Sequence, residues 1–246
     1  MFNDNTWNLL FENIVTRFAE SDYGIIASLW GDFTIFSIYY LSRIDKDKIK
    51  ALFDCLCKEE TAELLRKTNQ IYRDLLRRAD DIGKDNPMAS NLYEGLIFLA
   101  LWDASDRKIS VEELRTISEE MMSFPLLKAM GLMINANKKS GMARIAKMMH
   151  KDDAWLEAHP QYKAYSWDFH FDETKHQDGF YYHFTQCPLN TFARKEGYLE
   201  VLPIMCDIDY KTAALMHAKL YRDHTLAGGG EVCDYWFVGD KVENPK

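Results

Sequence analysis

The chain has 246 residues, with 38 acidic and 30 basic side chains, so its formal net charge is −8. Nucleic acids and anionic membrane surfaces are bound by clustered positive charge, and because the chain has no block of Lys and Arg we expect neither as a partner. Hydrophobic residues make up 47% and charged residues 28%, which is the balance of a soluble globular protein with a sizeable core.

The N-terminal part of the sequence indicates a cytoplasmic protein. Residues 1–15 show no basic start followed by an apolar run and a small-residue cleavage site, so we expect no signal peptide. The apolar stretch 25–41 is short for a membrane span and carries Asp32 near its middle, which favours a buried helix. The five cysteines are an odd number in a chain too long to need disulfides, so we predict free thiols.

The first third of the chain has the periodicity of helices. Apolar residues recur at helical spacing in 6–22, and again in a charge-laced stretch that ends before Gly83. Cys55 and Cys57 lie in this stretch, one residue apart, so they face different sides of a helix and we interpret them as small buried residues. Helix-breaking residues then gather in 83–91. We therefore predict a helical N-terminal segment at 1–88 and a second domain at 89–246.

The helical pattern continues into the second domain. A helix is predicted over 92–105, and Ser110 with Glu113 has the spacing of a capping box at the start of the next one. A calcium loop does not fit here, because Trp102 would take its first ligand position and Arg107 the position of its glycine. Further helix is predicted through 124–160, where a stripe of methionines is interpreted as core packing.

The last third of the chain alternates aromatic and polar residues, as half-buried strands do. Four strands are predicted, at residues 165–174, 179–187, 220–226 and 231–238. The stretch between the second and third strands is mostly helical, interrupted by Gly197 and Pro203. The predicted fold class is α+β: a mostly helical N-terminal region, then a small antiparallel sheet with a helical insertion.

Three cysteines stand at element ends or beside turns, where side chains meet pockets: Cys187, Cys206 and Cys233. None has the Cys-x-x-Cys spacing that identifies a metal site from sequence. They are either buried thiols of a small sheet domain or parts of a reactive site, and the sequence leaves both interpretations open.

Polar residues accompany the first two of these cysteines. Asp209 follows Cys206 at i+3, which places both on one face of a helix. Strand alternation predicts that His183 shares a face with Cys187. A cysteine and a histidine on one face could be an activated nucleophile and its base, or a core thiol beside a hydrogen-bonded histidine.

The third and fourth strands flank three consecutive glycines, Gly228–Gly230. We predict a hairpin turn there, and not a phosphate-binding loop, because a strand and not a helix follows. Alternation would place Arg222, His224 and Leu226 on one face of the third strand. In the fourth strand, Cys233 and Tyr235 would share one face and Asp234 would point to the other.

Together these segments resemble the L-2-amino-thiazoline-4-carboxylic acid hydrolase family over about residues 90–240. The matching elements are Cys187, Gly197 with Glu200, Cys206 with Asp209, Arg222, the Thr-Leu-Ala-Gly-Gly run from Thr225, and Cys233 with Asp234. The chain departs from the pattern at Tyr235, where phenylalanine is usual, and by an additional glycine in the turn. The tail also resembles the ending of 4-vinyl reductase-type ligand-binding domains.

The resemblance implies a hydrolase that acts on non-peptide carbon–nitrogen bonds in L-cysteine metabolism and opens a cyclic isothiourea-like ring to a carbamoyl-cysteine. The candidate catalytic residues are Cys187, Cys206, Asp209 and Asp234, with one of the thiols, Cys233 included, as nucleophile or one of the aspartates as base. The candidate substrate-binding residues are Arg222, Thr225 and His183, and Arg222 suits the substrate carboxylate.

No cofactor is required by this interpretation, although Cys187, Cys206 and Cys233 could instead hold a metal ion that activates water. The expected partner is a small-molecule substrate. The alternative is a non-catalytic domain that senses a small molecule or a metal, which the aromatic strands and the reductase-like ending would also suit.

Overall fold

The computed structural model describes residues 59–122 and 134–246. The chain divides into two compact units, Met1–Ala62 and Glu63–Lys246, and the second contains the sheet. The predictions for 6–22, for 25–41 and for Cys55 and Cys57 fall outside the described residues. The predicted domain boundary after residue 88 stays a prediction.

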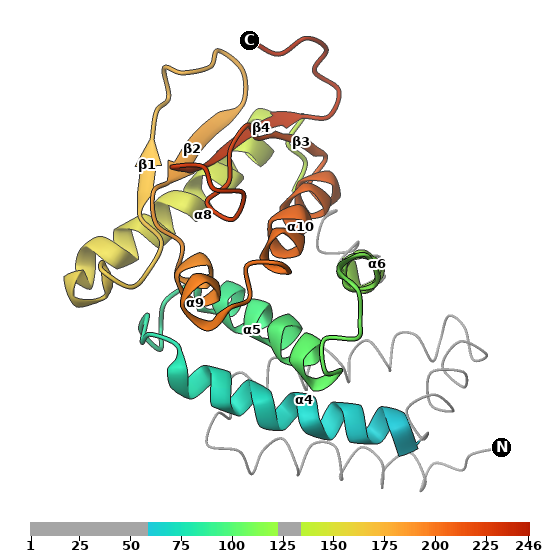
Figure 1. Ribbon diagram of the computed structural model, residues 1–246. Helices are drawn as coiled ribbons and strands as arrows, with labels where there is room; N and C mark the ends of the chain where they lie inside the picture. The colour runs from blue at the N-terminus through green and yellow to red at the C-terminus, as the bar shows by residue number, and fades with distance from the viewer. Residues whose placement is uncertain (1–58, 123–133) are drawn as a thin grey trace, which may run out of the picture. The chain divides into compact units, whose positions relative to one another are not determined.

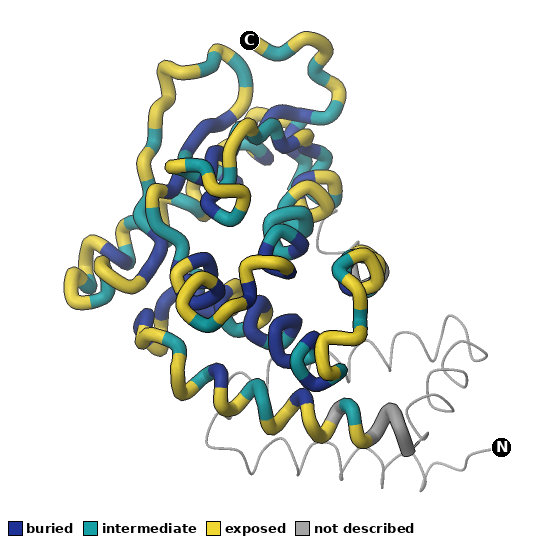
Figure 2. The backbone as a smooth tube through the Cα atoms, viewed as in Figure 1, coloured by how far each residue is buried: buried dark blue, intermediate teal, exposed yellow. Residues whose placement is uncertain are grey.

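Among the described residues, four helices precede the sheet: α4 (Glu59–Arg78), α5 (Ala89–Ala104), α6 (Val111–Met122) and α8 (Lys139–Ala158), the last followed by a 3₁₀ turn at Pro160–Tyr162. Helix α5 is apolar over most of its length and is buried on most sides, as such a helix must be (Figure 2). Helix α6 begins at the predicted capping box, where the Ser110 N–H donates to the Glu113 carboxylate at 2.8 Å and the Glu113 N–H donates to Ser110 Oγ at 3.2 Å.

The second half of the described chain carries the sheet. Its strands are β1 (Phe169–Phe171), β2 (Phe180–Phe184), β3 (Ala218–Tyr221) and β4 (Cys233–Gly239), in the antiparallel order β1-β2-β4-β3 (Figure 1). Helices α9 (Pro188–Glu196) and α10 (Leu202–Leu215) lie between β2 and β3 in the chain. The α+β class, with a helical insertion in a small antiparallel sheet, is confirmed.

Two residues that interrupt the helical pattern divide the insertion into α9 and α10. Gly197 ends α9 in the left-handed conformation at φ 80°, which glycine adopts without steric cost. Pro203 lies in the first turn of α10, where its missing N–H leaves no helical hydrogen bond unmade. The break turns the chain so that α10 packs against β3.

The two faces of the sheet differ in what covers them. Side chains alternate along each strand, so Tyr182 and Tyr235, paired across β2 and β4, share one face, while His183 and Asp234, the next pair, share the other. Helix α10 packs on β3. Helix α8 passes behind β1 and β2 in Figure 1 and contacts the Tyr182 side through His150, whose ring centre lies 4.0 Å from that of Phe171 at a tilt of 34°. We call the Tyr182 side the inner face and the His183 side the outer face.

The strands are shorter than predicted. The strand predicted at 220–226 ends at Tyr221, so Arg222, His224 and Leu226 are not on one strand face, and that prediction is wrong. The chain leaves the ladder because the Asp223 and His224 N–H groups donate to the Asp234 carboxylate instead of to a neighbouring strand.

The predicted hairpin is present, because β3 and β4 pair antiparallel and the three glycines lie in the chain between them, but the connection is longer than a tight turn. The glycines lie in a loop of residues 222–232 that joins β3 to β4. Within the loop, the Thr225 carbonyl accepts from the N–H groups of Gly228 and Gly230, and Gly229 takes φ 88°. A strand and not a helix follows the glycines, as predicted.

The hydrophobic core joins helices and sheet. It includes Leu75 of α4, Leu96 and Leu99 of α5, Ile204 of α10 and Phe237 of β4, each of them buried. The core therefore fixes α10 and β4 against each other, and the candidate site lies between them.

No helix among the described residues is long and apolar enough to cross a membrane.

Candidate active site

Arg222, the first residue after β3, forms the centre of a polar cluster on the inner side of the sheet. Its Nη2 donates to Asp209 Oδ2 at 2.7 Å, its Nη1 to the Cys206 carbonyl at 3.0 Å and its Nε to the Asp234 carbonyl at 3.1 Å. Only 2% of the side chain is exposed. Burial disfavours its charge, but Tyr235 and Asp209 outweigh burial and raise the pKa of Arg222 further above its ordinary value.

Asp209 is the acidic partner in this cluster. It lies one turn after Cys206 on α10, as the i to i+3 spacing predicts, and 35% of its side chain is exposed. The Tyr235 hydroxyl also donates to its Oδ2, at 3.0 Å. Burial raises the pKa of Asp209, although Arg222 and the Tyr235 hydroxyl offset part of that rise.

Tyr235 is held in a layered stack. The Arg222 guanidinium carbon lies 4.0 Å from the centre of its ring, and the Tyr182 ring lies on it at 4.8 Å and an interplanar angle of 6°. The strand register explains the second contact, because Tyr182 and Tyr235 are directly paired across β2 and β4. A cation over a tyrosine face and an aromatic stack both stabilise this arrangement.

The three cysteines converge next to this cluster. Cys187 is the N-cap residue of α9, Cys206 lies on α10 and Cys233 begins β4, yet each lies close enough for its ionisation to affect the others. Burial raises the pKa of Cys187 and of Cys206 to about 12, and it also raises the pKa of Cys233. These thiols are protonated near neutral pH.

The local contacts of Cys187 and Cys233 differ. The Leu189 and Asn190 N–H groups at the start of α9 approach the Cys187 sulfur, as does the Trp167 side chain. Cys233 Sγ accepts from the Leu226 N–H at 3.1 Å and so ties the loop 222–232 to β4. Both thiols therefore also take part in local structure.

Asp234 points to the outer face, as strand alternation predicts. Its Oδ2 accepts from the Asp223 N–H at 3.0 Å and its Oδ1 from the His224 N–H at 2.6 Å. Only 6% of the residue is exposed. The fold thus brings Asp209 and the thiols together on the inner face and places the Asp234 carboxylate on the opposite face, where it anchors the loop.

The structure also separates His183 from the thiols, whereas Thr225 stays in the loop beside Cys233. β2 ends at Phe184, so alternation does not extend to Cys187, and the shared face predicted for His183 and Cys187 is wrong. His183 stacks on His170 at 4.9 Å on the outer face, and its Nδ1 is buried without a partner in the part of the chain that the structure describes. Thr225 Oγ1 accepts from the Gly228 N–H at 3.0 Å within the loop.

Sequence reasoning missed the role of two residues of the cluster, Tyr182 and Tyr235. Alternation places Tyr235 on the face of Cys233, which is confirmed, but nothing in its spacing marks its hydroxyl as a partner of Asp209. Tyr182 carries no signal apart from its place in an aromatic strand. Burial raises the pKa of both hydroxyls well above the ordinary tyrosine value, so both are protonated.

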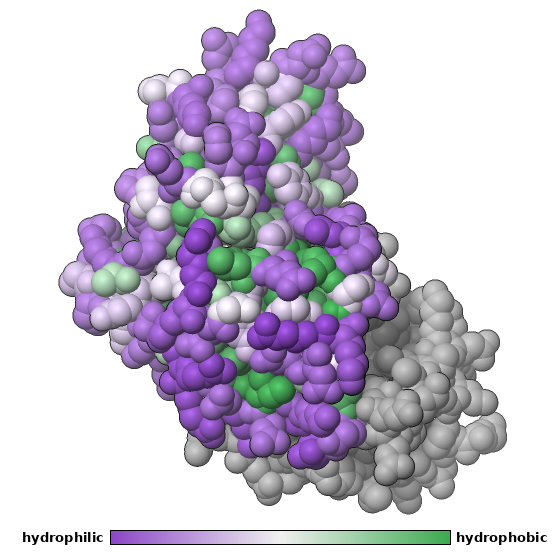
Figure 3. Space-filling view, in the orientation of Figure 1, coloured by the Kyte–Doolittle hydropathy of each residue, from purple (hydrophilic) through white to green (hydrophobic). Residues whose placement is uncertain are grey.

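Part of the surface near the candidate site is less polar than its surroundings. Figure 3 shows hydrophobic residues gathered at the middle of the face seen in Figure 1, where α9 and α10 lie, within a polar surround. Within 59–122 and 134–246, no three side chains among His, Cys, Asp and Glu are grouped so that they could hold a metal ion. The three thiols therefore do not form a metal-binding set on their own geometry.

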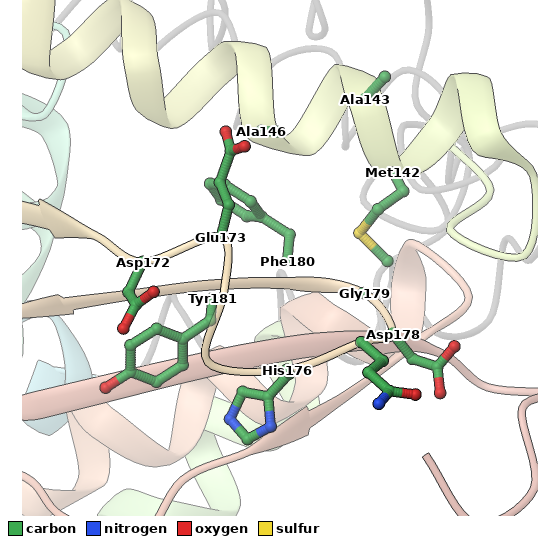
Figure 4. Close-up of a pocket in the computed structure, with 11 residues that line it drawn as sticks. Met142, Ala143, Ala146, Asp172, Glu173, His176, Asp178, Gly179, Phe180 and Tyr181 are labelled. Atoms are coloured by element: carbon green, nitrogen blue, oxygen red, sulfur yellow. The ribbon is translucent and has the colours of Figure 1, made fainter. Parts of the chain in front are cut away.

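A cleft of about 320 Å³ lies elsewhere, between α8 and the loop that joins β1 to β2 (Figure 4). Its wall includes Met142, Glu173, His176 and Phe180. None of the residues predicted for the site lines it, and it contains neither a thiol nor the Asp209 carboxylate.

Comparison with known proteins identifies the family. The model of the L-2-amino-thiazoline-4-carboxylic acid hydrolase family matches residues 90–237, which is more than half of the chain and includes every residue of the cluster around Arg222. Searches of curated proteins and of solved structures found no match. The chain belongs to the L-2-amino-thiazoline-4-carboxylic acid hydrolase family.

Proposed function

We propose that this protein is a hydrolase that opens the ring of 2-amino-thiazoline-4-carboxylate, or of a closely similar cyclic isothiourea or amidine, with Asp209 as general base. The observation that carries the proposal is the Asp209 carboxylate, which is partly exposed, is held by Arg222 and Tyr235, and lies near the thiols of Cys206 and Cys233. The family, which is named after such a hydrolase, supports the choice of substrate class.

The reaction consumes one water molecule, and both of its protons end on the product. Asp209 takes a proton from the water while the water oxygen bonds to the ring carbon between sulfur and nitrogen, and Asp209 then passes that proton to the ring nitrogen. The resulting tetrahedral carbon then breaks its bond to sulfur or to the ring nitrogen, the hydroxyl proton passes to the leaving atom, and a carbamoyl carbonyl forms. Loss of sulfur produces a free thiol, whereas loss of nitrogen keeps the carbon–sulfur bond.

Asp209 suits the role of base better than a thiol suits the role of nucleophile. A thiol with a pKa of about 12, as in Cys187 and Cys206, has a thiolate fraction of roughly one in 10⁵ at neutral pH. A carboxylate with a raised pKa is closer to the working range of a general base. We therefore assign the three thiols to the wall of the site.

The proposal assigns Arg222 a structural role at the site. The sequence favours it as the partner of the substrate carboxylate, but its three hydrogen bonds go to protein oxygens and 2% of its side chain is exposed. A guanidinium so enclosed holds Asp209 in one orientation. The small-molecule partner then meets the Asp209 carboxylate, and not the arginine.

The first test is Asp209→Asn in the full chain, assayed for ring opening of L-2-amino-thiazoline-4-carboxylate. Loss of a general base lowers turnover by about 10²–10⁴-fold, because amide nitrogen and oxygen do not accept the proton. Release of thiol and the mass of the product report which bond breaks. Asp207→Asn is the matched control, since Asp207 lies on the same helix, is 42% exposed and pairs with Arg115 of α6.

Three results would contradict the proposal. Turnover that survives in Asp209→Asn excludes this base. Alkylation of native Cys187 or Cys206 by iodoacetamide at the rate seen in urea would restore the nucleophile mechanism, because buried thiols of high pKa react slowly. Binding of the thiazoline to the native protein without any turnover would favour a non-catalytic sensor.

A further inference from the structure

Two donors reach the same oxygen of Asp209. Arg222 Nη2 and the Tyr235 hydroxyl both donate to Oδ2, at 2.7 and 3.0 Å. No described residue donates to Oδ1 within hydrogen-bond distance. Because 35% of the side chain is exposed, Oδ1 is the oxygen left to meet a ligand or a water molecule.

The Tyr235 hydroxyl has little freedom to move away from Oδ2. Its ring is enclosed between the Arg222 guanidinium, 4.0 Å from the ring centre, and the parallel Tyr182 ring at 4.8 Å. Its backbone belongs to β4, paired with β2 on one side and β3 on the other. Asp209 lies on α10, which packs against β3, so donor and acceptor come from packed elements.

We propose that Tyr235 is a positioning residue for the proposed reaction: its hydroxyl binds Oδ2 of Asp209 and so directs Oδ1 toward the water that attacks the ring. This inference rests on the proposed function. Tyr235 also sets the proton affinity of the base, because a hydrogen bond to the charged carboxylate favours that form over the neutral acid.

The other groups that face Asp209 are uncharged or fixed near neutral pH. They are Tyr182 from β2, Cys233 from β4, Cys206 from α10 and Arg222 after β3. Burial keeps the tyrosine and the two thiols protonated, and Arg222 keeps its charge. The group whose titration governs activity on the acid side is therefore Asp209 itself.

The test is Tyr235→Phe, which removes the hydroxyl and keeps the ring between Arg222 and Tyr182. We expect the pKa of Asp209 to rise, the acid limb of the pH profile of kcat to move to higher pH, and turnover on that limb to fall about tenfold, the worth of one hydrogen bond to a charged group. Tyr182→Phe is the control, because Tyr182 belongs to the same stack but makes no hydrogen bond to Asp209, and its acid limb stays in place.

A second variant covers the case in which Tyr235→Phe is poorly folded. Replacement of Tyr235 by 3-fluorotyrosine makes the hydroxyl a stronger donor, so the acid limb moves to lower pH. Opposite shifts in the two variants support the proposal. An acid limb that does not move in either variant, or that moves equally in Tyr182→Phe, overturns it.

The failure of this inference is distinguishable from failure of the proposed function. The carboxyl stretch of Asp209, identified as the infrared band missing in Asp209→Asn, reports its titration with or without substrate. If wild-type protein opens no ring, the proposed function fails, and the infrared titration of Tyr235→Phe still decides whether Tyr235 controls Asp209. If Asp209→Asn abolishes turnover while Tyr235→Phe leaves the titration unchanged, this inference alone fails.

Discussion

At the residue scale, Arg222 connects two elements, α10 and β4, that lie on either side of it in the sequence. Its acceptors are a carboxylate and a carbonyl on α10 and a carbonyl on β4. The planar guanidinium can reach all three because its N–H groups diverge in one plane. The residue therefore contributes both to the orientation of Asp209 and to the attachment of α10 to the sheet.

We expect Arg222→Lys to lower the free energy of unfolding by about 2 kcal/mol. An ammonium group keeps the positive charge but loses the planar guanidinium whose N–H groups point at the three acceptors. Urea unfolding monitored by circular dichroism measures the change. Arg66→Lys is the control, because Arg66 forms an exposed ion pair with Glu63 at 2.7 Å, and such a pair is worth under about 1 kcal/mol. Equal losses of unfolding free energy in the two variants would show that the three hydrogen bonds of the Arg222 guanidinium stabilise the fold no more than an exposed ion pair does.

At the scale of elements, the loop 222–232 is organised by the strand that comes after it. The Asp234 carboxylate accepts from two backbone N–H groups at the start of the loop, and Cys233 Sγ accepts from a third further along. These hydrogen bonds from β4 fix the backbone of a glycine-rich loop at three positions. The loop thereby holds Arg222 at its first position, next to α10.

We expect Asp234→Ala to lower the free energy of unfolding by about 1–3 kcal/mol, because two backbone N–H groups lose the partly buried carboxylate that accepts their hydrogen bonds. Hydrogen exchange of the amides at 223 and 224 becomes faster, and this localises the effect. The neighbouring Asp223→Ala removes a carboxylate that does not accept from these amides, and leaves both of them paired. Unchanged exchange at these amides in Asp234→Ala would argue against the anchoring role.

At the scale of the whole described unit, the inner face of the sheet brings two helices to one set of aromatic rings. Helix α10 presents Asp209 near Tyr182, and α8 presents Asp152 near the same tyrosine. Burial raises the pKa of Asp152 from 3.8 to about 6, with a small opposing effect of Lys151. The folded state therefore binds a proton at Asp152 more tightly than the unfolded state does.

This difference has a consequence for stability. Between about pH 4 and about pH 6 the folded state binds a proton at Asp152 that the unfolded state has lost, so stability falls as pH rises through this window. We expect Asp152→Asn to raise the urea midpoint at about pH 8 and to leave it nearly unchanged at about pH 3, below the ordinary pKa of 3.8, where both states are mostly protonated. A gain of equal size at both pH values would assign the effect to packing instead of ionisation.

The local signals in the sequence predict much of this fold. The capping box at Ser110, the break at Gly197 and the period-two strands all depend on residues near each other in the chain, and the structure contains each of them. The errors occur where a distant partner competes. The strand predicted through 226 ends at Tyr221 because Asp234, a residue of another strand, takes the hydrogen bonds that would continue it.

The family, the α+β class and the shared helical face of Cys206 and Asp209 can all be read from the residues in order, because motifs and periodicity are properties of chain neighbours. The folded chain was needed to learn that Arg222 is enclosed by protein oxygens, that Asp234 lies on the far face from Asp209, and that Tyr235 donates to the same oxygen as Arg222. Those contacts join α10 to β4 and to the loop before it. They depend on the strand order and on how helices pack on the sheet, which no local pattern records.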